Sequence, residues 1–382
     1  MKVKLKDICD VRDGTHDSPV YVADGYPLVT SKNIVDGKLD FSIVSYISQE
    51  DYDKINERSK VDKGDIIMPM IGTIGNPCLV GEYTNFAIKN VALIKFPNDE
   101  VKNKFVLYFL KSDAFKRYVA SKNKGGTQKF LSLGDIRNID IPQLSLEEQT
   151  EVIIHLERVE SIIELRKLEL ERLDDLIKSR FVEMFGNLKS NAKGWDIKTF
   201  DELTYLITDG EHSTPRRTDK GIYLLSARNV LNHSIQLEDV DYIDQEEYDR
   251  IAKRVIPRAG DVLISCSGTV GRCCSVPVGL QFQMVRSAAL LRFKENINPV
   301  FAEYMITSDY LQEQINSSKT ASSQANLFQG KIKALKGFVP PIELQNEFVN
   351  FVHQVDKSKV AVQKSLEETQ KLFDSLMQKY FG

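Results

Sequence analysis

Two histidines stand in a setting that acid–base chemistry can use. His16 lies in the segment Asp13–Pro19 and His212 in the segment Asp209–Pro215, and both segments read Asp-Gly-x-His-x-x-Pro. A neighbouring carboxylate and imidazole can move a proton or hold a metal ion, but a site of either kind needs a further group in both segments. No obvious one is present. The pattern favours a turn, in which Asp and Gly form the bend, Pro stiffens it, and His caps the loop or contacts a phosphate.

Recognised catalytic motifs are absent. The sequence has no G-x-x-x-x-G-K-[ST] phosphate loop, no G-x-S-x-G elbow and no H-E-x-x-H pair. It also lacks the Asn/Asp-Pro-Pro-aromatic tetrapeptide of adenine methyltransferases, for which Asn76-Pro77-Cys78 is the nearest match. No C-x-x-C spacing occurs among the five cysteines, which are Cys9, Cys78, Cys266, Cys273 and Cys274. We expect reduced, packed thiols, no metal site, no cofactor bound to this chain, and no catalysis.

The composition is that of an ordinary globular protein. Of 382 residues, 42% are hydrophobic and 27% charged, and the net charge is −3, which excludes a disordered chain and a strongly basic DNA-coating protein. No run of eighteen apolar residues exists, and residues 1–7 lack the apolar core of a secretory signal. We therefore expect a cytoplasmic protein that does not contact a membrane.

The chain repeats itself at an offset of 196 residues, as from His16 to His212. The matches include Gly25 with Gly221, Gly64-Asp65 with Gly260-Asp261, Gly72-Thr73-Ile74-Gly75 with Gly268-Thr269-Val270-Gly271, Ser112-Asp113 with Ser308-Asp309, and Phe185-Gly186 with Phe381-Gly382. Two copies are too few for a solenoid. The duplication predicts two similar modules related by pseudo-symmetry.

Each copy has the same order of predicted elements. Apolar runs predict strands at 65–68, 91–94, 261–264 and 288–291, and the Gly72–Gly75 and Gly268–Gly271 segments predict turns. Residues 102–122 and 299–317 each predict a helix. Together these elements predict an α+β fold.

A long helix is expected to close each copy. Steps of four and three residues place an apolar stripe on one face of each helix. The stripe residues are Val152, Leu156, Val159, Ile163, Leu170, Leu173 and Ile177 in the first helix, and Phe348, Val352, Val355, Val362, Leu366, Phe373 and Leu376 in the second. Arg166 and Lys359 interrupt the stripes. The helices could cover two separate cores, but we expect them to pair with each other as a long antiparallel coiled coil.

These features divide the chain into five parts. We expect globular domains at 1–145 and 197–341, long helices at 146–186 and 342–382, and a polar linker at 187–196.

Basic and amide side chains recur in the predicted loops of both copies. Arg can pair with a guanine edge, Asn or Gln with an adenine edge, and Lys with phosphate. The candidate DNA-binding residues are Lys32, Asn33, Lys89, Asn90, Thr127, Gln128 and Lys129 in the first copy, and Arg216, Arg217, Arg228, Asn229, Arg286, Ser287, Ser323 and Gln324 in the second. Any one of them could be a solvated surface residue. As a set they indicate two readers of different sequences, because the framework residues repeat while the loop residues differ.

The whole chain resembles the specificity subunit of Type I restriction–modification systems. The resemblance rests on the Asp-Gly-x-His-x-x-Pro turn, the Gly-Asp-hydrophobic strand, and the Gly-Thr-Ile/Val-Gly turn. It also rests on the junctions Ile139-Asp140-Ile141-Pro142 to Leu146-Glu147-Glu148-Gln149 and Val339–Gln345, of which only the second keeps a Pro-Pro pair.

The resemblance implies a non-catalytic DNA-binding subunit. Each globular region would be a target recognition domain for one half of a bipartite, asymmetric site in double-stranded DNA, and the coiled coil would fix the gap between the half-sites. Two modification subunits would supply S-adenosylmethionine and adenine-N6 methylation. Two restriction subunits would supply ATP- and Mg-dependent translocation and cleavage.

Other functions remain open on the sequence alone. The coiled coil could be a scaffold for protein assembly without DNA readout, or the two Asp-Gly-x-His turns could form an enzyme. A specificity chain that serves methylation without restriction would have the same sequence features.

Overall fold

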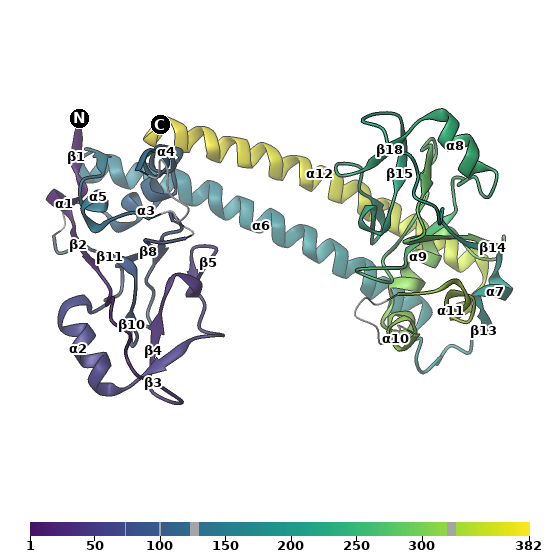
Figure 1. The fold of residues 1–382 in the computed structure, drawn as a ribbon, viewed down its shortest axis with the longest axis horizontal. Helices are drawn as coiled ribbons and strands as arrows, with labels where there is room; N and C mark the ends of the chain where they lie inside the picture. Colours follow the sequence, from purple (N-terminus) through teal and green to yellow (C-terminus); the bar gives the residue numbers. More distant parts are fainter. Residues whose placement is uncertain (73, 99–100, 123–129, 319–325) are drawn as a thin grey trace. The chain divides into compact units, whose positions relative to one another are not determined.

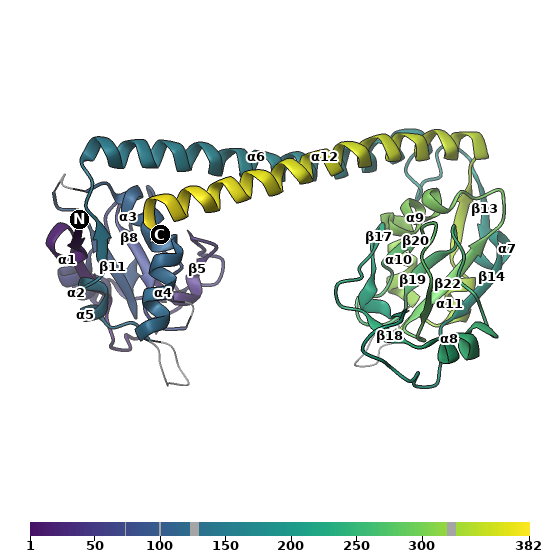
Figure 2. The same cartoon turned by 90° about the horizontal axis from the view of Figure 1, so that it is seen from above.

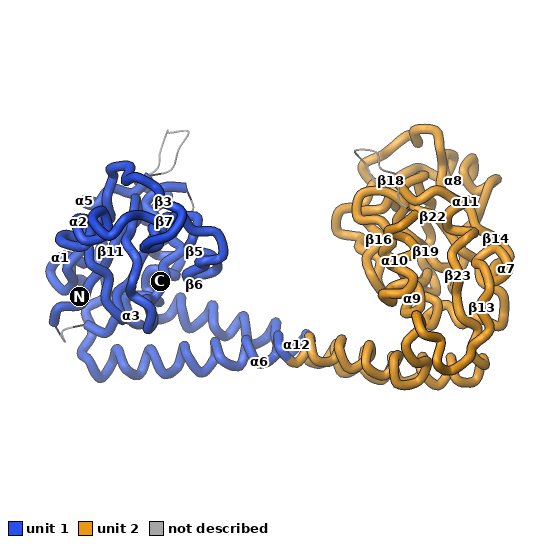
Figure 3. Tube along the Cα trace, turned by 90° about the horizontal axis from the view of Figure 1, so that it is seen from below, with its two compact units in different colours: residues 1–168, 363–382 blue, residues 169–362 orange. Residues whose placement is uncertain are grey.

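The computed structural model describes residues 1–72, 74–98, 101–122, 130–318 and 326–382. They form two compact units, shown in Figure 3. Unit 1 contains residues 1–168 and 363–382, and unit 2 contains residues 169–362. Each unit therefore combines one globular region of the repeat with one part of each long helix.

The described part of unit 1 contains two main sheets (Figure 1). The antiparallel sheet has the order β2-β11-β8-β9, with β2 at Asp10–Asp13, β8 at Ile66–Pro69, β9 at Cys78–Leu79 and β11 at Val91–Lys95. The mixed sheet has the order β10-β4-β7-β3, with β3 at Tyr21–Val22, β4 at Tyr26–Val29, β7 at Ser45–Ile47 and β10 at Ala87–Ile88. Two strand pairs complete the unit: β1 (Lys2–Lys4) with β12 (Asp140–Pro142), and β5 (Ile34–Val35) with β6 (Lys38–Leu39). Its shorter helices are α1 (Leu5–Ile8), the 3₁₀ turn η1 (Ser31–Asn33), α2 (Gln49–Ser59), α3 (Asn103–Lys111), α4 (Asp113–Lys122) and α5 (Leu133–Arg137).

Unit 2 repeats this arrangement (Figure 2). Its antiparallel sheet, β14-β22-β19-β20, contains β14 (Thr204–Asp209), β19 (Val262–Ser265), β20 (Cys273–Ser275) and β22 (Ala288–Phe293). Its mixed sheet, β18-β15-β21, contains β15 (Ile222–Leu225), β18 (Asp241–Ile243) and β21 (Phe282–Met284). The strand pairs are β13 (Asp196–Thr199) with β23 (Lys336–Val339), and β16 (Val230–Leu231) with β17 (Ser234–Ile235). The shorter helices are α7 (Phe200–Leu203), η2 (Ala227–Asn229), α8 (Gln245–Ala252), α9 (Pro299–Thr307), α10 (Asp309–Ser318) and α11 (Gln329–Lys333).

The central strands are continuous apolar runs because both faces of the sheet are covered. Side chains alternate between faces along a strand. In β8, Ile66 and Met68 belong to the core that includes the long helices, whereas Ile67 belongs to a second core under the mixed sheet. In β19, Ile264 and Leu263 divide in the same way. This two-sided burial explains why apolar runs marked the strands correctly.

The prediction of one helix at 102–122 and one at 299–317 was wrong, because each range contains two helices. Ser112 separates α3 from α4, and Ser308 separates α9 from α10. Both serines have extended backbones, and each hydroxyl donates to the carbonyl three residues earlier at 2.6 Å. This bond offers the backbone an alternative to the helix, and the aspartate that follows starts a new one.

The two long helices are α6 (Leu146–Phe185) and α12 (Ile342–Phe381). In unit 2, Lys359 Nζ lies 2.6 Å from Asp174, and Arg180 lies 3.0 Å from Glu347. The residue numbers of the α12 partners fall as those of α6 rise, so the helices pair antiparallel, as predicted. In unit 1, His155 Nδ1 lies 2.9 Å from the Tyr380 hydroxyl. The predicted stripe residues face inward, since each is buried or half-buried: Val152, Leu156, Val159, Ile163, Leu170, Leu173, Ile177, Phe348, Val352, Val355, Val362, Leu366, Phe373 and Leu376.

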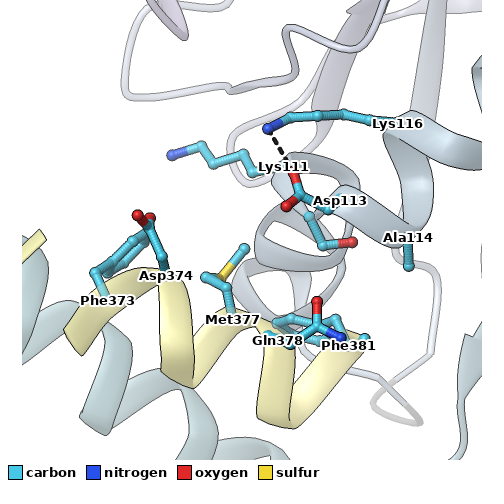
Figure 4. Close-up of a pocket in the computed structure, with 11 residues that line it drawn as sticks. Lys111, Asp113, Ala114, Lys116, Phe373, Asp374, Met377, Gln378 and Phe381 are labelled. Atoms are coloured by element: carbon cyan, nitrogen blue, oxygen red, sulfur yellow. Dashed lines mark hydrogen bonds and ion pairs between the residues drawn. The ribbon is translucent and has the colours of Figure 1, made fainter. Parts of the chain in front are cut away.

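The end of each long helix closes the core of one unit. Phe381 packs against Phe105 and Phe109 in unit 1, with ring centroids 5.3 and 6.0 Å apart, while Phe185 packs against Phe301 in unit 2 at 4.8 Å. Figure 4 shows the final turns of α12 beside the Lys111–Lys116 segment of unit 1, where they border a cavity of about 130 Å³.

A buried glutamine joins each long helix to its own globular region. The side-chain oxygen of Gln149 accepts the backbone N–H of Lys102 at 2.9 Å, and that of Gln345 accepts the N–H of Asn298 at 2.8 Å. Both side-chain amides also donate to backbone carbonyls. The matching residues of the two copies thus fix the same junction.

The five cysteines are buried and not bonded to one another. Burial raises the pKa of Cys266 to about 12, so its thiol stays protonated and unreactive at neutral pH. Among the described residues, no helix combines the length and the apolar character needed to cross a membrane.

Candidate nucleic-acid interface

A pair of parallel strands brings the predicted loops of unit 1 together. Strands β4 and β10 pair in parallel, so the segments that follow them leave the same edge of the sheet. The backbone N–H of Lys89 bonds the carbonyl of Val29 at 2.9 Å, and Thr15 forms a β-bridge with Lys89. The Lys89 ammonium lies 3.0 Å from the Ser18 hydroxyl. Lys32, in η1, follows β4 directly. The Asp-Gly-x-His turn, Lys32 and Lys89 therefore converge on one edge.

Unit 2 builds the same edge from β15 and β21, which also pair in parallel. The N–H of Val285 bonds the carbonyl of Leu225 at 2.9 Å, and Glu211 forms a bridge with Val285. Arg228 lies in η2 after β15, and Arg286 follows β21. The Ser287 hydroxyl accepts the N–H of Ala227 at 3.0 Å and ties the two loops together.

The glycine of each Asp-Gly-x-His turn is required by close packing. A Cβ at Gly14 would lie 2.3 Å from the carbonyl oxygen of Ile88, and one at Gly210 would lie 2.3 Å from that of Met284. The turn is thus pressed against the parallel strands, and the histidine position is fixed relative to that edge.

Two residues predicted to contact DNA, Asn33 and Asn229, use their side-chain amides in hydrogen bonds within the protein. Asn229 is buried; its oxygen accepts the N–H and hydroxyl of Ser226, and its amide donates to the carbonyls of Gln236 and Asp239 at 3.1 and 2.9 Å. Asn33 makes the equivalent set of bonds around Thr30. An amide whose donors and acceptor are all used cannot also bond a base edge. We therefore assign both residues to the framework and omit them from the proposed interface.

Three of the predicted basic side chains of unit 2 are held by acids. Arg217 Nε and Arg228 Nη2 lie 3.0 and 3.1 Å from the same carboxylate, Asp241, and Arg216 lies within 3.0 Å of Asp244 and Glu246. These pairs are exposed and therefore weak, so a DNA phosphate or base can compete for the guanidinium groups. Lys32 and Arg286 are exposed and have no ion-pair partner among the described residues.

The third predicted loop pair lies outside the described residues. This holds for Thr127, Gln128 and Lys129 in the first copy and for Ser323 and Gln324 in the second. The described residues that follow these segments bond the ends of the antiparallel sheets: the N–H of Leu131 bonds the Met70 carbonyl, and that of Leu327 bonds the Cys266 carbonyl, both at 2.9 Å.

The Asp and His of each histidine turn form a cluster with an arginine that was not predicted from the sequence. In unit 1, one oxygen of Asp13 pairs with Arg58, and the other lies 2.9 Å from His16 Nε2. In unit 2, Asp209 lies 2.6 Å from Arg254 and 2.7 Å from His212 Nε2. Arg58 and Arg254 are 196 residues apart, as the two histidines are. The internal repeat could therefore have identified both arginines as candidate site residues.

The ring of His16 has a second partner. Its Nδ1 lies 2.9 Å from Oδ1 of Asn90, a residue held at a positive φ of 56°. The hydrogen bond to Asp13, followed by that to Asn90, raises the pKa of His16 above its usual value. Arginine replaces asparagine at the equivalent position, Arg286, whose N–H bonds the Glu211 carbonyl as the N–H of Asn90 bonds the Thr15 carbonyl. Within the part of the chain that the structure describes, no three His, Cys, Asp or Glu residues gather as a metal site.

Comparison with known proteins identifies the class. The family model for the "Type I restriction modification DNA specificity domain" matches residues 1–174 and again residues 192–370. Two copies of a DNA-recognition domain, each ending in a long helix, thus make up most of the chain. The chain belongs to the family of Type I restriction–modification specificity subunits. Specificity subunits of this family are non-catalytic DNA-recognition subunits, in agreement with the sequence-based prediction.

Curated relatives agree with this family. The EcoKI specificity subunit of Escherichia coli K12 is 21% identical over 94% of this chain and 83% of its own length. The EcoBI specificity subunit of Escherichia coli is 30% identical over 43% of this chain, a match that spans 35% of the EcoBI subunit.

Two solved structures share the fold. One, described as "Structural basis underlying complex assembly and conformational transition of the type I R-M system", has a TM-score of 0.64 at 20% identity and covers 100% of this chain and 97% of its own. The S subunit from M. genitalium has a TM-score of 0.55 at 14% identity, with 100% and 96% coverage.

Proposed function

We propose that unit 1 and unit 2 each read one half of a bipartite, asymmetric site in double-stranded DNA. One observation carries the proposal: the same edge is built twice from matching framework residues, yet its exposed side chains differ. Lys32 is replaced by Arg228, Lys89 by Val285, and Asn90 by Arg286, so the loop pairing Lys89-Asn90 with Arg286-Ser287 is shifted by one residue. Arginine presents a planar fork that fits a guanine edge, whereas lysine presents a point charge. Two such edges would favour different bases.

We propose that the paired helices receive two modification subunits and set the distance between the half-sites. Several apolar side chains on these helices face solvent, among them Leu165 and Leu372 in unit 1 and Val182 and Val360 in unit 2. Exposed apolar side chains on a helical surface suit contact with a partner protein. The modification subunits would bind S-adenosylmethionine and methylate adenine, and two restriction subunits would add ATP- and Mg-dependent translocation and cleavage. This assembly would act on DNA in the cytoplasm.

Methylation mapping tests the proposal. The chain is co-expressed with its modification subunit in a host that lacks this methylation, and methylated adenines are mapped across the genome. A single motif of two half-sites with a fixed gap is the expected result. Methylation with no such motif, or no methylation from a stable complex, would refute DNA readout and leave the scaffold function.

A further inference from the structure

The Asp–His–Arg cluster borders an open groove in unit 1. The groove has a volume of about 550 Å³, and it lies between the Gly14–Pro19 segment and the face of α2 that carries Lys54 and Arg58. His16 and Arg58 are largely exposed, at 59% and 65% of their side-chain surface, whereas Asp13 is 9% exposed. The buried carboxylate thus holds His16 and Arg58 in place, while the remaining guanidinium donors of Arg58 face solvent.

The cluster is identical in both copies, whereas the surrounding loop residues are not. Asp13, His16 and Arg58 correspond to Asp209, His212 and Arg254, and Lys54 corresponds to Arg250. Residues shared by two readers of different half-sites cannot distinguish those half-sites. They are suited to the part of DNA that is the same everywhere, the phosphate backbone.

We propose that Asp13–His16–Arg58 and Asp209–His212–Arg254 are two sequence-independent binding sites for DNA backbone phosphate, one in each unit. Arg58 and Arg254 donate to the phosphodiester oxygens, whereas the aspartate and the histidine are positioning residues that do not touch DNA, since both ring nitrogens of His16 are bonded within the protein. The inference rests on the proposed function, since it needs each unit to bind DNA. It separates affinity, set by the clusters, from specificity, set by the loops.

One acidic residue at the groove, Asp51, and its counterpart Glu247 in unit 2 each bind a backbone N–H. The Asp51 carboxylate accepts the N–H of Val20 at 3.2 Å, and its counterpart Glu247 accepts the N–H of Arg216 at 3.2 Å. These bonds tie the end of each turn to α2 in unit 1 and to α8 in unit 2. Asp17 lines the rim in unit 1, and Ser213 stands at its place in unit 2.

Salt dependence of DNA binding tests the inference. The complex with the modification subunit is titrated against two duplexes of equal length, one carrying the mapped motif and one with both half-sites scrambled. Loss of one phosphate contact lowers the slope of log K against log salt by about 0.9, which is about eightfold in affinity at 0.1 M salt. We expect this loss on both duplexes for Arg58→Gln and for Arg254→Gln, and about sixtyfold for the double variant.

Two further variants keep the test decisive. The first is Lys54→Gln. Lys54 lines the same groove one turn before Arg58, so its replacement should lower the slope of log K against log salt without exposing the buried Asp13 carboxylate. Lys63→Gln is the matched control: it is an exposed, acid-paired lysine that precedes β8, at the end of the sheet opposite the histidine turn. Its slope should equal that of the unaltered protein.

Each other outcome overturns the inference or the function separately. A larger loss on the motif duplex than on the scrambled one would make the arginines base contacts. An unchanged slope in folded Arg58→Gln and Lys54→Gln, or loss of the modification subunit instead of DNA, would refute phosphate binding. Unaltered protein that binds both duplexes equally would refute the proposed specificity function but not the phosphate sites, which are judged on the scrambled duplex.

Discussion

Replacement of Phe381 by alanine should destabilise unit 1 and leave unit 2 unchanged. The Phe381 side chain is 3% exposed and packs against Phe105 and Phe109 at the centre of unit 1. Removing a fully packed phenylalanine costs about 3–5 kcal/mol, from lost transfer energy and the cavity left behind. For a unit of this size each kcal/mol lowers the melting temperature by about 2–4 °C. The unit 1 transition should therefore fall by about 6–20 °C.

The single tryptophan makes the two units distinguishable. Trp195 belongs to unit 2, where its indole N–H donates to the Phe185 carbonyl at 2.9 Å. Differential scanning calorimetry reports both units, and tryptophan fluorescence reports unit 2 alone. In Phe381→Ala the fluorescence transition should stay at its original temperature, whereas Phe185→Ala should move it.

A control on the same helix completes the design. Leu372 is 52% exposed, so Leu372→Ala should change the stability by less than about 0.5 kcal/mol. If Phe381→Ala shifted the fluorescence and calorimetric transitions together, the two units would unfold as one, and the assignment of residues 363–382 to unit 1 alone would fail. An unshifted calorimetric profile would show that the end of α12 does not complete that core.

The remaining predictions concern the proposed interface and the helix pair. Deleting one heptad from each long helix, residues 164–170 and 364–370, removes about 10 Å of rise, so the gap between half-sites should shorten by about three base pairs or recognition should be lost; methylation mapping that returns the original gap would exclude a ruler. Arg286→Ala should weaken only the half-site read by unit 2, by about 1–3 kcal/mol, whereas equal weakening on all DNA would make it a phosphate contact. Asn229→Ala should destabilise unit 2 by about 1–3 kcal/mol for each backbone group left unpaired. Urea unfolding followed by tryptophan fluorescence measures this loss. A variant that keeps full stability but loses DNA binding would contradict the framework role of Asn229. Because the pKa of His16 is raised in the fold, protonated His16 should stabilise the protein fully below about pH 6.5, and this stabilisation should be lost as the pH rises through the raised pKa. The difference in unfolding free energy between the unaltered protein and His16→Gln should therefore shrink at higher pH. A difference that does not change with pH would contradict this prediction.

Sequence periodicity predicted the elements whose burial is uniform along their length. The stripes from Val152 and Phe348 onward gave the long helices and their pairing, because one face of each helix is buried throughout. Apolar runs gave β8 and β11, because both faces of these strands are covered. By contrast, Ser112 interrupts an otherwise helical pattern through a local hydrogen bond that hydrophobic periodicity does not record.

The roles of single loop residues were harder to predict, because they depend on distant parts of the chain. Asn33 and Lys32 are neighbours in sequence, yet η1 buries the first and exposes the second. Arg58 reaches Asp13 only because α2 packs beside the histidine turn, a contact between residues 45 positions apart. Comparing the two copies recovers some of this information, since a shared contact leaves a repeated residue pair.

The division of the chain has a consequence for its synthesis. Unit 2 is one continuous segment, residues 169–362, whereas unit 1 needs residues 363–382, which follow all of unit 2. On the ribosome, domains fold as their segments emerge, at about 5–20 residues per second. The unit that begins first is therefore completed second, about 1–4 s after its neighbour. Until then the cavity for Phe381 in unit 1 stays unfilled, so the nascent chain exposes apolar surface while the second recognition domain is already folded.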